Sequence, residues 1–497
     1  MRIAVFACLL GALSAAAAPA TGPMFDADTL AAAEELRDDA LSGTGAWEIV
    51  SSLTTEVGPR LAGSAGDRAA VAWALQTLRE LGFENVRAEN VEVPHWERGS
   101  INVRITEPFP QPLVATALGG SIGTPEQGVE APVLQVADIA ELEALPRSQV
   151  EGRIVFFNKR MRRARDGSGY GELVDARTKG AATASKVGAA AVVIRSIGTS
   201  TARVAHTGTT KYASDVRPIP AVAISNADAD QLEAQLETGR RVALRIELTA
   251  RNLPSERSAN VIADVPGTDP DTGIVLLAAH LDSWDLGTGA VDDGAGVAIV
   301  IETARRLAAA KLPLVRTVRV LLAANEEFGL SGAEAYAQAR TERVDGHVVG
   351  LESDFGSGRV WRFESRVAEH ALPLVEAIHA VLAPLGIERG GNEANGGADL
   401  SPLRKRGMPV LGLNHDGTHY FDVHHTASDT LDKVDAGDLD QSVAAYTVTA
   451  FLAAVAPRDF GRIAPEPEAP DAETGETSGG GRRPADAKPS RTSSTDQ

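Results

Sequence analysis

The stretch HLDSWDLGTGAVDD runs from His280 to Asp293 and directly follows the apolar run IVLLAA at 274–279. An apolar run of this length, bounded by polar residues, predicts a buried strand that ends at the histidine. The stretch contains one histidine and four aspartates. Charge of that density beside a buried strand costs free energy unless something compensates it. The stretch therefore indicates a compensating partner of opposite charge.

From residue 258 onward, apolar strand patterns alternate with helical ones. This alternation predicts an α/β fold: an α/β/α sandwich around a mixed, mainly parallel sheet. Ligands bind at the carboxyl ends of the strands in such sheets. Polar residues follow strand after strand here. The expected strands are 274–279, 317–324, 346–351 and 409–413, and the expected helices are 296–310 and 367–382, the latter with Pro373 disturbing its first turns.

Six residues at these strand ends and loops form a candidate metal site. Each alone has an ordinary structural reading: Asp292 and Asp293 suit the cap of the following helix, and a lone histidine is more often structural than a ligand. Together, two imidazoles and several carboxylates would repel one another without a cation. Zinc takes these ligand types, and five ligands suit two zinc ions better than one tetrahedral ion. The six are His280, Asp292, Glu326, Glu327, Asp354 and His425.

Seven segments carry a resemblance to a known family. On them the chain resembles the co-catalytic di-zinc aminopeptidases, in the branch of plasma glutamate carboxypeptidase (carboxypeptidase Q). The resemblance covers nearly the whole chain between a predicted signal peptide and the C-terminal tail. The segments are VGPRLAGS (57–64), VPHWERG (93–99), HLDSWDLGTGAVDDGAG (280–296), NEEFGLSGA (325–333), LESDFGSG (351–358), NGGADLSPL (395–403) and HHTASDT (424–430).

The resemblance implies two Zn²⁺ ions per chain. His280 and Asp354 would hold one ion, and Glu327 and His425 the other, with Asp292 bridging both. His425 rather than His424 keeps the spacing His-x-x-x-Asp-Thr, and Asp292 rather than Asp293 lies twelve residues after His280. Cobalt or manganese also suit such ligands.

The resemblance also implies further roles. Glu326 would be the general base that takes a proton from a metal-bridging water, the nucleophile, and returns it to the leaving amine. Asp282 would bond the far ring nitrogen of His280 and so orient that ligand. The peptide bond between Asp292 and Asp293 would be cis.

The substrate pocket is less specified by the sequence. Some relatives have a tyrosine where this chain has His424, so the oxyanion donor stays open between His424 and Tyr420. The loop GGNEANGGAD at 390–399 is a candidate pocket wall, with Asn395 and Asp399 as candidate substrate contacts. An ordinary turn is the alternative for this loop.

The chain divides into five parts. Arg2, the apolar residues 3–18 and the small-residue pattern Ala18-Pro19-Ala20 predict a signal peptide and hence export to a periplasmic or extracellular space. A helix over 66–82 with Asp67 as its N-cap is expected in the second part. The parts are 1–20 (signal peptide), 21–111 (N-terminal part of the peptidase domain), 112–250 (an inserted, β-rich, protease-associated-like domain), 251–461 (the di-zinc peptidase domain) and 462–497 (a disordered tail).

Composition excludes several function classes. A net charge of −19 argues against nucleic acid, which requires clustered Lys and Arg. No apolar run after the signal peptide is long enough to span a membrane. The one cysteine, Cys8, lies in the signal peptide, so no disulfide is expected. The resemblance suggests a homodimer, and the inserted domain is expected to be a lid or packing platform.

The predicted function is an exopeptidase, a dipeptidase or aminopeptidase, acting on small unblocked peptides. Two alternatives use the same scaffold. One is a metal-binding receptor-like protein without catalysis, which the complete ligand set disfavours. The other is a glutaminyl cyclase-like acyltransferase with a single zinc ion.

Overall fold

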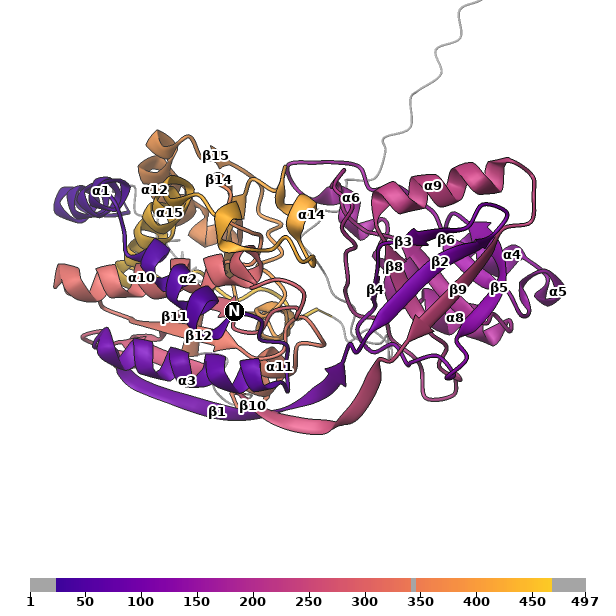
Figure 1. Cartoon of the computed structure of the whole chain (residues 1–497). Coiled ribbons are helices and arrows are strands. Elements are labelled where there is room, and N and C mark those ends of the chain that lie inside the picture. Colours follow the sequence, from indigo (N-terminus) through magenta and orange to yellow (C-terminus); the bar gives the residue numbers. More distant parts are fainter. Residues whose placement is uncertain (1–23, 341–345, 467–497) are drawn as a thin grey trace, which may run out of the picture.

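The strand that leads into His280 lies near the centre of an eight-stranded mixed sheet (Figure 1). The computed structural model describes residues 24–340 and 346–466. In the sheet, β12, β11, β13 and β16 are parallel neighbours, and the flanking strands add antiparallel pairs. The order is β1 (Glu84–Glu97), β10 (Arg251–Val265), β12 (Thr317–Ala323), β11 (Ile274–His280), β13 (His347–Glu352), β16 (Val410–His415), β14 (Val360–Arg366) and β15 (Glu388–Arg389).

Helices cover both faces of this sheet because its strands are apolar on both sides. Val275 and Leu277 of β11 belong to the apolar cluster that contains the helices of one face, and Leu276 belongs to the cluster of the other. The first face carries α1 (Ala27–Leu41), α2 (Ala46–Ser52), α3 (Ala65–Glu80), α10 (Ala295–Ala310), α12 (Leu372–Leu382) and α15 (Ala436–Val455); the second carries α11 (Ser331–Gln338) and α13 (Ser401–Lys405). The predicted α/β/α sandwich is confirmed.

A second sheet forms a separate unit at the right of Figure 1. Its helices pack on two faces: α9 (Asn226–Glu237) on one, and α4 (Ile139–Ala144) and α8 (Gly180–Lys186) on the other. The strand order is β3 (Gln111–Leu113), β2 (Ile101–Glu107), β9 (Ala243–Leu248), β5 (Val129–Val136), β6 (Ile154–Phe157), β7 (Ala191–Arg195), β8 (Ala221–Ile224) and β4 (Ala115–Ala117).

The two units are joined by a long ribbon and by loops. β1 and β10 pair along most of their length and lead into β2 and out of β9. In Figure 1 this ribbon runs along the lower edge of the molecule. The short helices α6 (Ser168–Gly171) and α14 (Tyr420–Val423) meet where the units touch, with the rings of Tyr170 and Phe421 stacked at 5.0 Å. The remaining short elements are α5 (Arg147–Val150), α7 (Val174–Thr178), η1 (Leu53–Val57), η2 (Pro270–Thr272), η3 (Ala290–Gly294), η5 (Glu369–Ala371), η6 (Ala383–Leu385) and η7 (Leu431–Lys433).

Several element boundaries differ from the sequence predictions. The second sheet begins at Ile101 rather than at residue 112, because β2 follows the linking ribbon after only a short break. Helix α12 begins at Leu372 rather than at 367. Residues 369–371 form the short 3-10 helix η5, and Pro373 lies in the first turn of α12, where a missing N–H costs nothing. Ser64, not Asp67, caps α3.

Two predicted parts lie at the ends of the chain. The predicted signal peptide, 1–20, lies outside the described residues, as do residues 467–497 of the predicted tail. The described part of that tail includes Glu466, which pairs with Arg366 at 3.2 Å. Among the described residues, none of the helices is both long enough and apolar enough to cross a bilayer.

The buried strand β11 provides a test of the core. Leu277 is fully buried, whereas Leu41 is 45% exposed. We expect Leu277→Ala to lower the free energy of unfolding by about 2–5 kcal/mol, because it leaves a cavity between sheet and helices. Leu41→Ala, the same substitution on the surface, should change it by less than about 0.5 kcal/mol. Urea titration of both variants measures the difference, and equal losses would contradict the assigned core.

Candidate metal centre

Adjacent parallel strands bring four of the candidate residues to one sheet edge. β12, β11 and β13 are neighbours, so their carboxyl ends lie side by side. His280 ends β11. Glu326 and Glu327 follow β12, and Asp354 follows β13. The loops that carry Asp292 and His425 complete the cluster.

The first half of the cluster surrounds the ring of His280. Its Nε2 lies 3.2 Å from Oδ1 of Asp292 and 3.4 Å from Oδ1 of Asp354. One ligand atom from each of the three residues falls within 4.8 Å of the others. His280 and Asp292 are buried. This spacing suits one shared cation.

The second half of the cluster uses the other oxygen of Asp292. The Nε2 of His425 lies 3.5 Å from Oδ2 of Asp292 and 2.9 Å from Oε2 of Glu327. Among the described residues, the buried atoms Oδ2 of Asp292 and Oε1 of Glu327 have no hydrogen-bond partner. Buried polar atoms are normally satisfied, so these two oxygens indicate a second cation, and ligand atoms of Asp292, His424 and His425 lie there within 4.8 Å of one another.

The two adjacent histidines are distinguished by their second contact. The Nε2 of His424 lies 3.6 Å from Oδ2 of Asp292, so the distance to Asp292 does not separate it from His425. The rings stack with centroids 3.5 Å apart. Glu327, however, lies at 2.9 Å from His425. The ring Nδ1 of His425 faces the carbonyl of Thr207 at 3.4 Å, which leaves its Nε2 directed toward the carboxylates.

Asp282 holds the strand end that carries the two glutamates. Its carboxylate accepts hydrogen bonds from the backbone N–H groups of Glu326, at 2.9 Å, and Glu327, at 3.4 Å. Its Oδ1 lies 3.6 Å from Nδ1 of His280, while its own carbonyl lies closer, at 3.1 Å. The Asp282 carboxylate therefore lies beside His280 and also binds the backbone N–H of Glu326.

Three residues outside the candidate set shape the loop between His280 and Asp292. The Asp292–Asp293 peptide bond is cis, as the resemblance implied. Asp293 accepts from the backbone N–H of His280 at 3.1 Å, and Asp429 accepts from that of Val291 at 2.6 Å. The third residue is Arg60.

Arg60 is a fully buried cation beneath this loop. Its guanidinium donates to the carbonyls of Leu281 at 2.6 Å and of Thr288 and Gly289 at 2.8 Å. Arg60 lies in the segment VGPRLAGS, which supported only the family resemblance. Because the three carbonyls lie more than 200 positions after Arg60 in the chain, no local sequence pattern could have predicted these contacts.

Protonation of the cluster also indicates a cation. Burial alone would lower the pKa of His280, but the carboxylates of Asp354, Asp282 and Asp292 raise it well above its ordinary value. Burial, and then the charge of Asp292, raise the pKa of Glu327. In the absence of a cation, protons therefore reduce the repulsion among these groups, and a bound metal would displace them.

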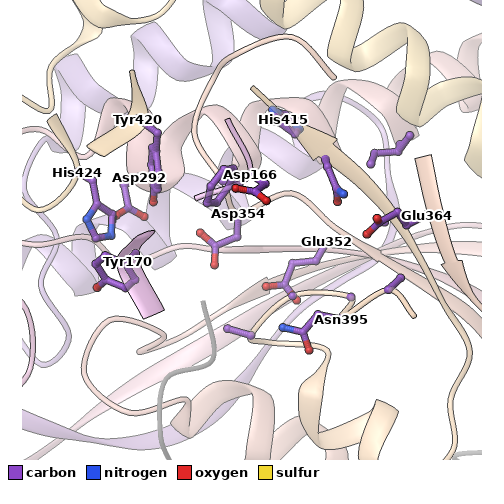
Figure 2. A pocket seen from close by; sticks show the side chains of 18 of the residues that line it. Asp166, Tyr170, Asp292, Glu352, Asp354, Glu364, Asn395, His415, Tyr420 and His424 are labelled. Carbon is purple, nitrogen blue, oxygen red and sulfur yellow. The ribbon is translucent and has the colours of Figure 1, made fainter. Parts of the chain in front are cut away.

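A pocket extends from the metal centre into the protein. Figure 2 shows Asp292 and His424 at one end, Asp354 between, and Glu352 with Asn395 beyond. Glu326, Tyr420 and Asn395 line this pocket. Asp166 and Tyr170 of the second unit also line this pocket, and neither was predicted from the sequence.

Asp399 lies beside the pocket rather than among its lining residues. It is 2% exposed, and its backbone N–H donates to Oε1 of Glu352 at 3.1 Å. Burial raises the pKa of Asp399 to about 8. Glu352 itself lines the pocket, and both carboxylate oxygens of Asp399 are buried without a hydrogen-bond partner among the described residues.

Comparison with known proteins agrees with this geometry. The sequence pattern of peptidase family M28 matches residues 260–449. Carboxypeptidase Q of Mus musculus is 32% identical over 408 residues, which are 82% of this chain and 85% of that protein. Aminopeptidase YwaD of Bacillus subtilis is 22% identical over 82% of this chain and 84% of its own length.

Two solved structures share the fold. A peptidase M28 precursor from Shewanella amazonensis superposes with a TM-score of 0.87 at 44% identity, covering 88% of this chain and 99% of that one. A zinc aminopeptidase from Bacillus subtilis superposes with a TM-score of 0.60 at 19% identity, covering 82% and 93%. The α/β/α sandwich and the cluster of histidines and carboxylates at its strand ends define the class of protein, a metallopeptidase. The chain belongs to peptidase family M28.

The contacts of Asp282 generate a prediction. Asp282→Asn keeps one acceptor oxygen but turns an amide N–H₂ toward a backbone N–H. We expect metal affinity and kcat to fall about 10- to 100-fold, the usual cost of losing a partner behind a metal ligand. Zinc retention at buffered free Zn²⁺ and steady-state kinetics measure both. Asp271→Asn, on an exposed turn, serves as the control, and equal behaviour of the two variants would exclude this role.

Proposed function

We propose that this peptidase is a di-zinc exopeptidase that hydrolyses small unblocked peptides. The observation that carries the proposal is the carboxylate of Asp292, whose two oxygens face two different sets of donors. A donor set of imidazoles and carboxylates suits zinc. The name of the zinc aminopeptidase from Bacillus subtilis, which shares the fold, supports the same metal.

The proposed ligands follow from the two halves of the cluster. His280 and Asp354 hold one zinc ion, Glu327 and His425 hold the other, and Asp292 contacts both. When bound, the ions polarise the scissile carbonyl and lower the pKa of a water molecule toward about 7. His425 is oriented through its Nδ1, so that its neutral Nε2 is free to act as a ligand.

Glu326 performs the proton transfers. Its side chain lines the pocket, and its backbone is held by Asp282 at 2.9 Å. It removes a proton from the attacking water as the bond to the carbonyl carbon forms. It then donates that proton to the amine as the C–N bond breaks. Tyr420 and His424 line the pocket beside Asp292 and are the candidates for stabilising the oxyanion.

The far end of the pocket supports an exopeptidase. An exopeptidase requires charged groups that recognise a peptide terminus. Besides Asn395, the lining of the pocket includes Glu364 and Glu393 as carboxylates and Arg362 as a cation, which lies 3.4 Å from Glu364. A free amino terminus pairs with the former and a free carboxylate with the latter. The names carboxypeptidase Q and aminopeptidase of the relatives also denote exopeptidases.

Export and assembly complete the proposal. The signal peptide predicted at 1–20 would direct the chain to a periplasmic or extracellular space, and the resemblance suggests a homodimer. Sequencing of the secreted protein's amino terminus and its mass in solution test these two points.

Removing the general base separates catalysis from metal binding. We expect Glu326→Gln to lower kcat by about 10²- to 10⁴-fold while two zinc ions per chain are retained. Asp292→Asn should instead reduce the zinc content below one ion per chain, because it removes the shared ligand. Kinetics and metal analysis measure both effects. Glu334→Gln, an exposed glutamate on α11, is the control that should match the wild type. Full zinc occupancy in Asp292→Asn would contradict the bridging role.

A panel of three peptides tests the substrate class. We expect the zinc-loaded chain to cleave an unblocked dipeptide and to leave its N-acetylated form intact, because acetylation removes the terminal charge. A free tetrapeptide distinguishes the two exopeptidases: an aminopeptidase shortens it stepwise from the amino end, and a dipeptidase does not cut it. Cleavage of the acetylated peptide at the same rate would refute recognition of the amino terminus.

A further inference from the structure

A short segment of the second unit lies directly against the metal centre. Residues 206–209 belong to the connection between β7 and β8 of the second sheet, and three of their side chains are at most 3% exposed. The segment makes hydrogen bonds to the backbone of three site residues. They are His206 Nδ1 to the His424 carbonyl at 2.8 Å, the Thr207 N–H to the His425 carbonyl at 2.9 Å, and the Thr209 hydroxyl to the Glu327 carbonyl at 2.7 Å.

Thr207 holds His425 from two sides. Its N–H binds the carbonyl of His425, and its own carbonyl faces the ring Nδ1 of His425 at 3.4 Å. His425 has a φ of 61°, a left-handed conformation that is unfavourable for a residue with a Cβ. The contacts of Thr207 therefore stabilise both the backbone and the ring direction of this residue.

The path of the segment is itself specified. Gly208 has a φ of 131°, and a Cβ there would lie 2.3 Å from the guanidinium of the buried Arg177. The hydroxyl of Thr207 accepts from Arg98 at 3.1 Å. Arg98 also donates at 3.0 Å to both carboxylate oxygens of Asp285, in the loop that follows His280. The half-buried Arg98 thus ties this segment to the loop of the metal centre.

We propose that residues 206–209 of the second unit are an outer layer of the metal centre, with Thr209 as the positioning residue for Glu327. The inference rests on the proposed function, since it treats Glu327 and His425 as zinc ligands. The sequence predicted a lid or packing platform for this unit. The unit supplies hydrogen bonds to the segments that carry Glu327 and His425, and zinc affinity therefore depends on both units.

Thr209 and its neighbour offer a matched pair of variants. Both threonines are 3% exposed, but the hydroxyl of Thr210 has no hydrogen-bond partner among the described residues. Thr209→Val removes the hydroxyl and keeps the shape, and Thr210→Val makes the same change where no bond is lost. Thr209→Ser keeps the hydroxyl. Competition of each metal-free chain with a chromophoric chelator for Zn²⁺ measures affinity without activity.

We expect Thr209→Val to bind Zn²⁺ about tenfold more weakly and to lose kcat with little change in KM. Thr210→Val should match the wild type, and Thr209→Ser should restore zinc affinity. Equal zinc affinity of Thr209→Val and Thr210→Val would overturn the proposal, whether both are normal or both weakened. Asp292→Asn separates this failure from a failure of the proposed function. If Asp292→Asn also keeps its zinc, the metal centre itself is wrong; if only Thr209→Val keeps it, the outer layer alone is wrong.

Discussion

The carboxylate of Asp292 is the constraint on which the site depends. One of its oxygens faces His280 and the other faces His425, at 3.2 and 3.5 Å. Asp354 shares the imidazole of His280 with Asp292, and Glu327 shares that of His425, so these carboxylates repel one another until a cation or protons relieve the repulsion. The surrounding protein therefore has to hold acidic groups together before the metal arrives. Arg60, which binds three carbonyls of the same loop, shows how it does so without adding a competing ligand.

The strands of the sheet place four of the candidate residues, and loops place the other two. Parallel neighbours deliver His280, the two glutamates and Asp354 to one edge, which needs no more than the register of β12, β11 and β13. Asp292 and His425 come from loops, and loops need outside support. The carboxylate of Asp429 supports the first loop by accepting a hydrogen bond from the backbone N–H of Asp292, and Thr207 of the other unit supports the second. The sheet therefore places four of the residues, whereas His425 depends on how the two units pack.

The sequence predictions failed where the local pattern was ambiguous. The segment at 360–366 forms β14, an antiparallel strand outside the alternating strand and helix rhythm, and the rhythm therefore did not predict it. The boundary at 112 was wrong because β1 and β2 follow one another with only a short break. Asp399 was expected as a substrate contact; it is buried beside the pocket and does not line it, a position that the sequence of the loop alone does not give.

The sequence by itself determined the sandwich and the candidate ligands. The sandwich follows from hydrophobic periodicity, and the candidate ligands follow from the polar residues at strand ends together with the family resemblance. Only the tertiary structure decided what surrounds the ligands. Thr209 and Glu327 lie 118 positions apart, and Thr207 and His425 lie 218 apart. Contacts at such separations arise from the packing of two sheets, and no periodicity in either segment records which backbone group it will meet.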